Sequence, residues 1–170
     1  MILPDHEIRR LCLAGMVTPF EPSLVNPASL DLRLGNRLLI ESAQSPSLVP
    51  YPLEHHSEAE PYMLQPGQFV LAHTVETFNL PPTTAAQFVL KSSRAREGLE
   101  HLLAGYCDPG WSGSVLTLEL HCSRQLHPVL LWPGMKIGQM VFHQIAAPPE
   151  RDYSLTGRYN GDTTVMGSRG

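Results

Sequence analysis

Short apolar runs separated by prolines and glycines recur along the chain and predict a mainly β fold. Apolar and polar residues alternate from Leu30 to Gly35, and another apolar run follows Asn36, so two strands with a break between them are expected. Further strands are predicted at residues 69–71, 87–90, 115–120, 129–132 and 135–145.

Two helices are predicted beside these strands. Asp5 can cap a short helix in which Ile8, Leu11 and Cys12 recur at helical spacing, and a second short helix is expected over residues 95–103. The polar, proline-punctuated segment 42–61 is expected to be a long surface loop. The polar, glycine-rich tail 148–170 is expected to become ordered on binding a ligand or a neighbour and to close over it.

Length and composition indicate a single domain. A chain of 170 residues with 42% apolar content can bury one sizeable core. The net charge of -4 provides no basic surface for nucleic acid. An acidic N-terminal segment and the lack of a long apolar run argue against a signal peptide or a membrane span, so a cytoplasmic protein is expected.

Glu119 is the first candidate for chemistry, because it interrupts an apolar strand. Strand alternation places Thr117 and Glu119 opposite the face formed by Leu116, Leu118 and Leu120. A carboxylate there either faces water or has a partner and a shifted pKa, and a raised pKa favours proton transfer. The alternative is a solvated glutamate on a half-exposed sheet.

Residues 91–96, K-S-S-R-A-R, form a second candidate site. They place three cations and two hydroxyls directly after an apolar strand, where a strand-to-helix turn also presents backbone N–H groups to anions. The segment therefore predicts a phosphate-binding site, with a solvated basic helix start as the alternative.

A zinc site like that of the common cytidine deaminases is not expected. Such a site needs H-x-E together with P-C-x-x-C. His56-Ser57-Glu58 satisfies the first pattern, but neither Cys107 nor Cys122 has a second cysteine at the required spacing. The three cysteines are an odd number at unrelated spacings, which is typical of reduced thiols.

Four segments in order resemble motifs of the dCTP deaminase branch of the dUTPase-like superfamily. They are N-P-A-S-L-D-L-R-L-G at 26–35, K-S-S-x-A-R at 91–96, A-G-Y-C-D-P-G-W-S-G at 104–113 with T-L-E-L at 117–120, and L-W-P-G-M-K-I-G-Q at 131–139. The resemblance implies a distorted β-barrel or jelly-roll, assembled as a homotrimer with active sites between subunits.

The resemblance also implies an activity, the hydrolysis of dCTP to dUTP and ammonia without zinc. Glu119 would take a proton from water and relay it to the ring and the leaving amine, while Ser92 and Arg96 hold the water and the carboxylate. The implied nucleotide contacts are Lys91, Ser93, Arg94, Ala104, Tyr106, Asp108, Thr117, Gln139, Tyr153, Arg158 and Asp162. Asp108 would contact the deoxyribose, and Mg2+ would bridge phosphate oxygens.

Three departures from the family pattern carry expectations of their own. Leu103 replaces a common threonine, so feedback control by dTTP is not expected. The run from Asp108 to Glu119 is one residue longer than usual, so a β-bulge is expected to aim the carboxylate. Asp162 stands where the family has a glutamine beside the triphosphate, and its repulsion predicts that dCMP or dCDP is accepted as well as dCTP or better.

Two other functions stay open. One is dUTP diphosphate hydrolysis, alone or combined with deamination; the Glu119 carboxylate favours a deaminase over a pure dUTPase. The other is a nucleotide-binding trimer without turnover, which the altered spacing before Glu119 motivates.

Overall fold

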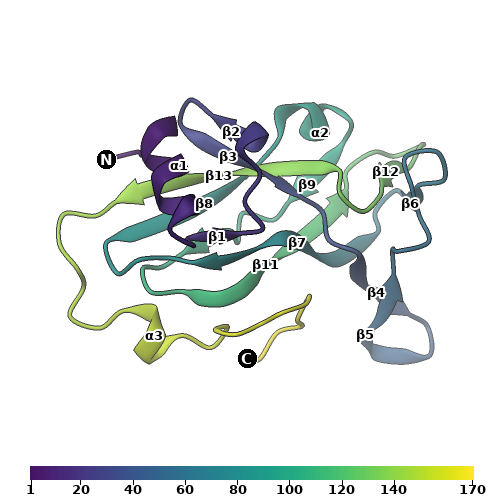
Figure 1. Cartoon of the computed structure of the whole chain (residues 1–170). Coiled ribbons are helices and arrows are strands. Elements are labelled where there is room, and N and C mark those ends of the chain that lie inside the picture. The colour runs from purple at the N-terminus through teal and green to yellow at the C-terminus, as the bar shows by residue number, and fades with distance from the viewer.

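Two β-sheets lie one over the other and form the body of the computed structural model, which describes residues 1–170 (Figure 1). The larger sheet has the order β5 (Ser45–Pro52), β4 (Arg37–Ser42), β7 (Phe69–Asn79), β11 (Ser112–Cys122) and β9 (Leu99–His101), with β1 (Val17–Thr18) paired to β7. The second has the order β10 (Tyr106–Cys107), β8 (Thr84–Leu90), β13 (Lys136–Gln144), β3 (Ser29–Arg33) and β2 (Val25–Asn26). A small third sheet pairs β12 (Val129–Leu131) with β6 (Tyr62–Leu64).

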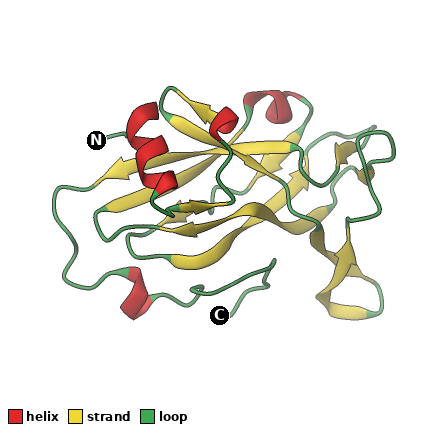
Figure 2. Ribbon diagram, in the orientation of Figure 1, coloured by secondary structure: helices red, strands yellow, loops and turns green.

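Helices are short and lie outside the sheets (Figure 2). They are α1 (Asp5–Leu13), the 3-10 turn η1 (Pro22–Leu24), α2 (Ser92–Arg96) and α3 (Tyr153–Thr156). The mainly β fold class predicted from the sequence is therefore confirmed. No helix is long and apolar enough to cross a membrane.

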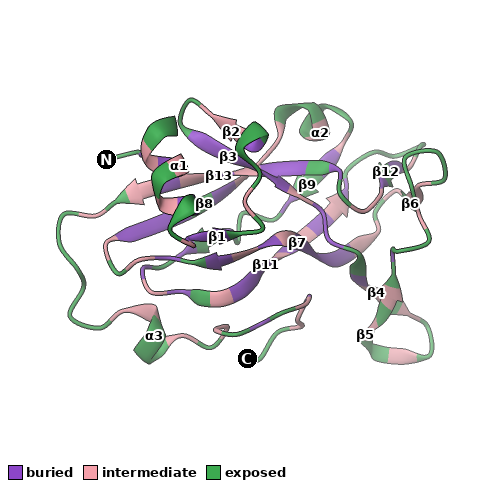
Figure 3. Ribbon diagram, in the orientation of Figure 1, coloured by how far each residue is buried: buried purple, intermediate pink, exposed green.

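One apolar core fills the space between the sheets, and buried segments dominate the central strands (Figure 3). Strand β11 shows the predicted alternation, with Leu116, Leu118 and Leu120 buried and Thr117 and Glu119 half-buried on the other face. Burial of each leucine removes apolar surface from water, so this pattern fixes which face of β11 carries the polar side chains.

Three local predictions are corrected. Asp5 is the first residue of α1 and not its cap, which is Pro4. The segment 42–61 is not all loop, because β5 pairs with β4 as a hairpin. The helix predicted for 95–103 is also wrong: α2 begins at Ser92 and ends at Arg96. Gly98 then turns the chain at φ +93°, so that the following residues form β9.

The tail after β13 packs against the body of the protein, and its ordering by a ligand or a neighbour stays a prediction. It runs beside β11 (Figure 1), where the Val115 amide donates to the Asp162 carbonyl at 2.8 Å. The Gly161 amide donates to the Ser112 carbonyl at 3.1 Å. These bonds satisfy edge groups of β11 that no other strand covers, which explains why the tail has a fixed path.

Candidate active site

A cavity of about 840 Å³ opens between β11, the loop that precedes it and the tail. The predicted proton-transfer residue Glu119 lines this cavity together with Ala104, Tyr106, Asp108 and Thr117. Residues from separate parts of the sequence thus meet around one concave space of the size that holds a small-molecule ligand.

The tail supplies another wall of the same cavity. Tyr153 and Asp162, both predicted as nucleotide contacts, line it beside Tyr159. The Trp111 indole N–H donates to the Tyr159 carbonyl at 3.0 Å, and the Met166 amide donates to the Thr117 hydroxyl at 3.3 Å. The tail is therefore fastened to the loop before β11 and to β11 itself.

A β-bulge interrupts β11 ahead of Glu119, and a second register shift follows between Val115 and Thr117. Ser112 lies opposite Asn79 and Ser114 lies opposite the next residue, Phe78, so Gly113 has no counterpart on β7. Gly113 has φ +67°, a conformation that glycine adopts without strain. The bulge predicted from the extra residue between Asp108 and Glu119 is confirmed at this position.

A buried histidine faces Glu119. Strand β9 pairs with β11 so that His101 lies opposite Leu120, and its Nε2 is 3.2 Å from Oε2 of Glu119. The side chain of His101 is 4% exposed and that of Glu119 is 25% exposed, and neither of the two facing atoms has a hydrogen-bond partner. Both atoms are shielded from solvent and His101 does not line the cavity, so the imidazole contacts the carboxylate from inside the protein.

Sequence reasoning did not place His101 beside Glu119, because it predicted a helix over residues 95–103. The imidazole also packs against the Phe88 ring, with 4.7 Å between ring centroids. A strand assignment for β9 was needed to find this contact, since only cross-strand register brings His101 beside β11.

The loop from Ala104 to Asp108 is held close to β8. The Gly105 carbonyl accepts from the Phe88 amide at 2.8 Å, and Cys107 is buried in β10 while Asp108 is exposed. Burial, together with the neighbouring Asp108 carboxylate, raises the pKa of the Cys107 thiol well above its usual range. Although Cys107 lines the cavity, its sulfur is therefore a protonated packing group and a poor metal ligand.

The predicted phosphate-binding segment does not line this cavity. Ser92, Ser93 and Arg96 are exposed on α2, which Figure 1 shows on the side of the sheets opposite the tail. Lys91 instead donates from Nζ to Oδ1 of Asp31 at 2.7 Å.

Three other predicted contacts also lie outside the cavity wall. Arg94 forms an ion pair with Glu97 at 2.8 Å and lies over the Trp132 ring. Gln139 accepts a hydrogen bond from the Ser29 hydroxyl at 3.0 Å, and Arg158 is exposed. Within one chain, these residues are not brought together with Glu119.

The cavity wall carries three carboxylates, Asp108, Glu119 and Asp162, and no lysine or arginine. Asp162 is not an uncompensated anion, however, because its Oδ1 lies 2.5 Å from Nη2 of Arg169. Asp162 is therefore paired with a cation, while the acceptance of dCMP or dCDP stays a prediction. No group of three or more histidine, cysteine, aspartate or glutamate side chains is placed to hold a metal ion.

Residues 2–145 match the family model described as dCTP deaminase-like. The chain belongs to this family. This dCTP deaminase-like chain is 40% identical to the dCTP deaminase, dUMP-forming, of Mycolicibacterium vanbaalenii, over 99% of its length and 95% of that protein. It is 36% identical to the protein of the same name from Corynebacterium efficiens, over 100% and 94% of the two chains.

The fold of this dCTP deaminase-like chain also has a counterpart among solved structures. The 2'-deoxycytidine 5'-triphosphate deaminase from Agrobacterium tumefaciens superposes with a TM-score of 0.69 at 22% sequence identity. The match covers 84% of this chain and 48% of that one, so this chain spans about half the length of the Agrobacterium protein. At this identity the likeness shows the fold, which agrees with the resemblance identified in the sequence.

Proposed function

We propose that the protein hydrolyses the 4-amino group of dCTP, with Glu119 as the general acid and base. The observation that carries this proposal is the position of Glu119, recessed in a nucleotide-sized cavity beside the buried His101. The relatives at 36–40% identity over the whole chain are named as dCTP deaminases, which supports the same substrate.

The proton inventory of this reaction needs one carboxyl group. Glu119 accepts a proton from water as the hydroxide adds to C4 of cytosine, and it passes that proton to N3 of the ring. Glu119 then takes the hydroxyl proton of the tetrahedral adduct and delivers it to the 4-amino group, which leaves as ammonia and gives the uracil base. The carbonyls of the loop that begins at Ala104 hold the attacking water, and Asp108 hydrogen-bonds to the deoxyribose.

A homotrimer with shared active sites completes the phosphate end of the cavity. A nucleoside triphosphate carries several negative charges, whereas the cavity wall of one chain has three carboxylates and no lysine or arginine. The exposed Ser92, Ser93 and Arg96 on α2 are free to reach the cavity of a neighbouring copy. There Ser92 and Arg96 orient the water and Glu119, while Ser93 faces the phosphates.

Mg2+ enters with the substrate as a phosphate-bound ion in this proposal. Mg2+ commonly binds through phosphates and water with few protein ligands, which fits a cavity whose carboxylates do not cluster. It neutralises phosphate charge. After exhaustive chelation, adding Mg2+ alone is expected to restore deamination. Recovery that requires zinc would contradict the proposal.

We further propose that dUMP is the final product. The relatives are named dUMP-forming, which means that their reaction releases diphosphate as well as ammonia. In this chain water would cleave the bond between the α-phosphorus and the bridging oxygen of dUTP, giving dUMP and diphosphate. Deamination that stops at dUTP is the second candidate, because the position of Glu119 supports the first step alone.

Product analysis tests both steps. Purified protein is incubated separately with dCTP, dCDP, dCMP and dUTP, and nucleotides, ammonia and diphosphate are quantified. Equal amounts of dUMP, ammonia and diphosphate from dCTP are expected. Accumulation of dUTP would limit the activity to deamination, and binding of dCTP without any ammonia would indicate a non-catalytic nucleotide-binding protein.

A further inference from the structure

Arg169 lies at the rim of the cavity in a position that the proposed mechanism does not use. Its guanidinium Nη2 is 2.5 Å from Oδ1 of Asp162, and both Asp162 and the adjacent Ser168 line the cavity. The guanidinium also lies over the Tyr159 ring, 5.3 Å from its centroid. Arg169 thus forms an ion pair with a residue of the cavity wall, whose charged side chains are all carboxylates.

The anchor of Arg169 is buried and hydrogen-bonded. Asp162 is 8% exposed, and its backbone is bonded to β11 through the Val115 amide at 2.8 Å and the Ser114 hydroxyl at 3.3 Å. The Arg169 amide donates to the Tyr159 hydroxyl at 3.2 Å, and its Nη1 donates to the Arg158 carbonyl. The guanidinium is therefore held on several sides before any ligand arrives.

Part of the Arg169 side chain remains open to solvent. The side chain of Arg169 is 37% exposed, whereas that of Asp162 is 9% exposed. An arginine has five N–H donors in a planar fork, so the bonds to Asp162 and Arg158 leave donors free for a second oxyanion. The ion pair also removes the repulsion that a bare Asp162 carboxylate would exert on a phosphate.

We propose that Arg169 is a specificity-determining residue that binds the outer phosphates of a deoxycytidine triphosphate, with Asp162 as its positioning residue. This inference rests on the proposed function and deepens it. It assigns the preference for a triphosphate over a monophosphate to an arginine carried by the tail. Charge-assisted hydrogen bonds between arginine and phosphate are among the stronger polar contacts, so their loss is measurable as a change in KM.

The test compares wild type with Arg169→Gln, Arg169→Lys and Asp162→Asn, using dCTP, dCDP and dCMP as substrates. Arg169→Gln is expected to raise KM for dCTP about tenfold or more, with a smaller increase for dCDP and the smallest for dCMP. Arg169→Lys restores part of the dCTP affinity because the charge is kept. Asp162→Asn raises KM for dCTP as well, because the guanidinium loses its anchor.

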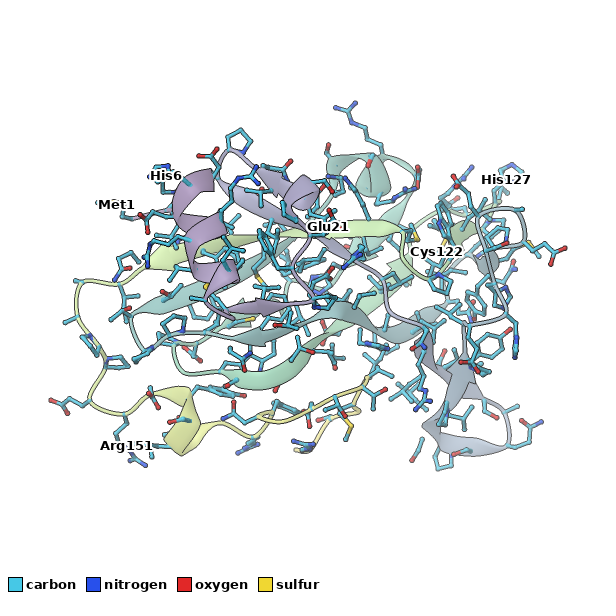
Figure 4. The ribbon with its side chains drawn as sticks, viewed as in Figure 1. Met1, His6, Glu21, Cys122, His127 and Arg151 are labelled. Atoms are coloured by element: carbon cyan, nitrogen blue, oxygen red, sulfur yellow. The ribbon has the colours of Figure 1, made fainter.

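A matched control comes from the same tail. Arg151 is exposed and projects away from the body of the protein (Figure 4), so Arg151→Gln removes one positive charge from the tail at a position that does not line the cavity. The Arg151→Gln variant is expected to leave KM unchanged for all three nucleotides. A similar rise in KM for dCTP in Arg151→Gln would mean that only the net charge of the tail matters, and would overturn the assignment to Arg169.

The dependence on phosphate number separates binding from structural support. The proposal would be overturned if Arg169→Gln changed KM by the same factor for all three nucleotides, so that the ratios of their KM values stayed as in wild type. If wild type released no ammonia from any nucleotide, the proposed function would fail. Calorimetric titration of wild type and Arg169→Gln with dCTP and dCMP would then still decide whether Arg169 recognises phosphates.

Discussion

Gly105→Ala is expected to disturb the candidate active site through one added methyl group. A Cβ at this position would lie 2.6 Å from Cβ of Phe88 and 3.4 Å from Cε1 of His101. Carbon atoms in contact are separated by about 3.5 to 4.0 Å, so the loop has to move away from β8 by about 1 Å. That shift would move the loop carbonyls proposed to hold the attacking water.

This shift is expected to lower kcat more than the stability of the fold. A misplacement of about 1 Å in a catalytic arrangement can lower the rate about hundredfold, while overpacking lowers stability by about 1–3 kcal/mol. We therefore expect kcat for ammonia release from dCTP to fall about hundredfold in Gly105→Ala. Circular dichroism and thermal unfolding check that the variant remains folded under the assay conditions.

Gly167→Ala is the matched control, because Gly167 lines the same cavity but an added Cβ there meets no atom within 4 Å. It is expected to change kcat by less than about threefold, which is within the scatter of neutral surface changes. A folded Gly105→Ala variant with wild-type kcat, or an equal loss in both variants, would refute the proposed role of the loop carbonyls.

Two predictions concern the stability of β7. Burial lowers the pKa of His73 although its ring hydrogen-bonds to the Thr74 carbonyl, so the unfolded chain takes up a proton first as pH falls. Stability should decline below about pH 6.5, and His73→Gln should flatten the pH dependence of Tm between pH 7 and 5; an unchanged slope would contradict this. Glu76 is 1% exposed and pairs with Arg33 at 2.8 Å. Glu76→Gln should therefore lower the free energy of unfolding in urea by about 2–4 kcal/mol, and a decrease below about 0.5 kcal/mol would contradict this.

The sequence predicts much of the fold because most strands have one buried face. The alternation in β11 and the break at Gly35-Asn36 both follow from local pattern and turn chemistry. Strand β5 is not predicted, since its prolines and polar residues lie at the edge of a sheet, where proline is tolerated. Strand β9 is hidden because its three residues form a strand only by pairing with β11.

The candidate site is predicted in part for the same reason. Glu119 and Asp108 belong to recognisable motifs, and the structure brings them to one cavity. His101 acquires its partner Glu119 only through the pairing of β9 with β11, and Arg169 reaches Asp162, seven residues earlier in the tail, only through the path that the tail takes. Neither contact has a local sequence pattern, so tertiary structure is required to find it.

Ammonia release from dCTP by Glu119→Gln, measured beside dCTP binding by calorimetry, tests the central claim most directly. The amide keeps the size of the side chain but cannot carry a proton between water and the base. We expect kcat to fall by about 10²–10⁴-fold, with a dissociation constant for dCTP within a few-fold of wild type. Turnover at the wild-type rate would show that another group performs the proton transfer, and would contradict the account.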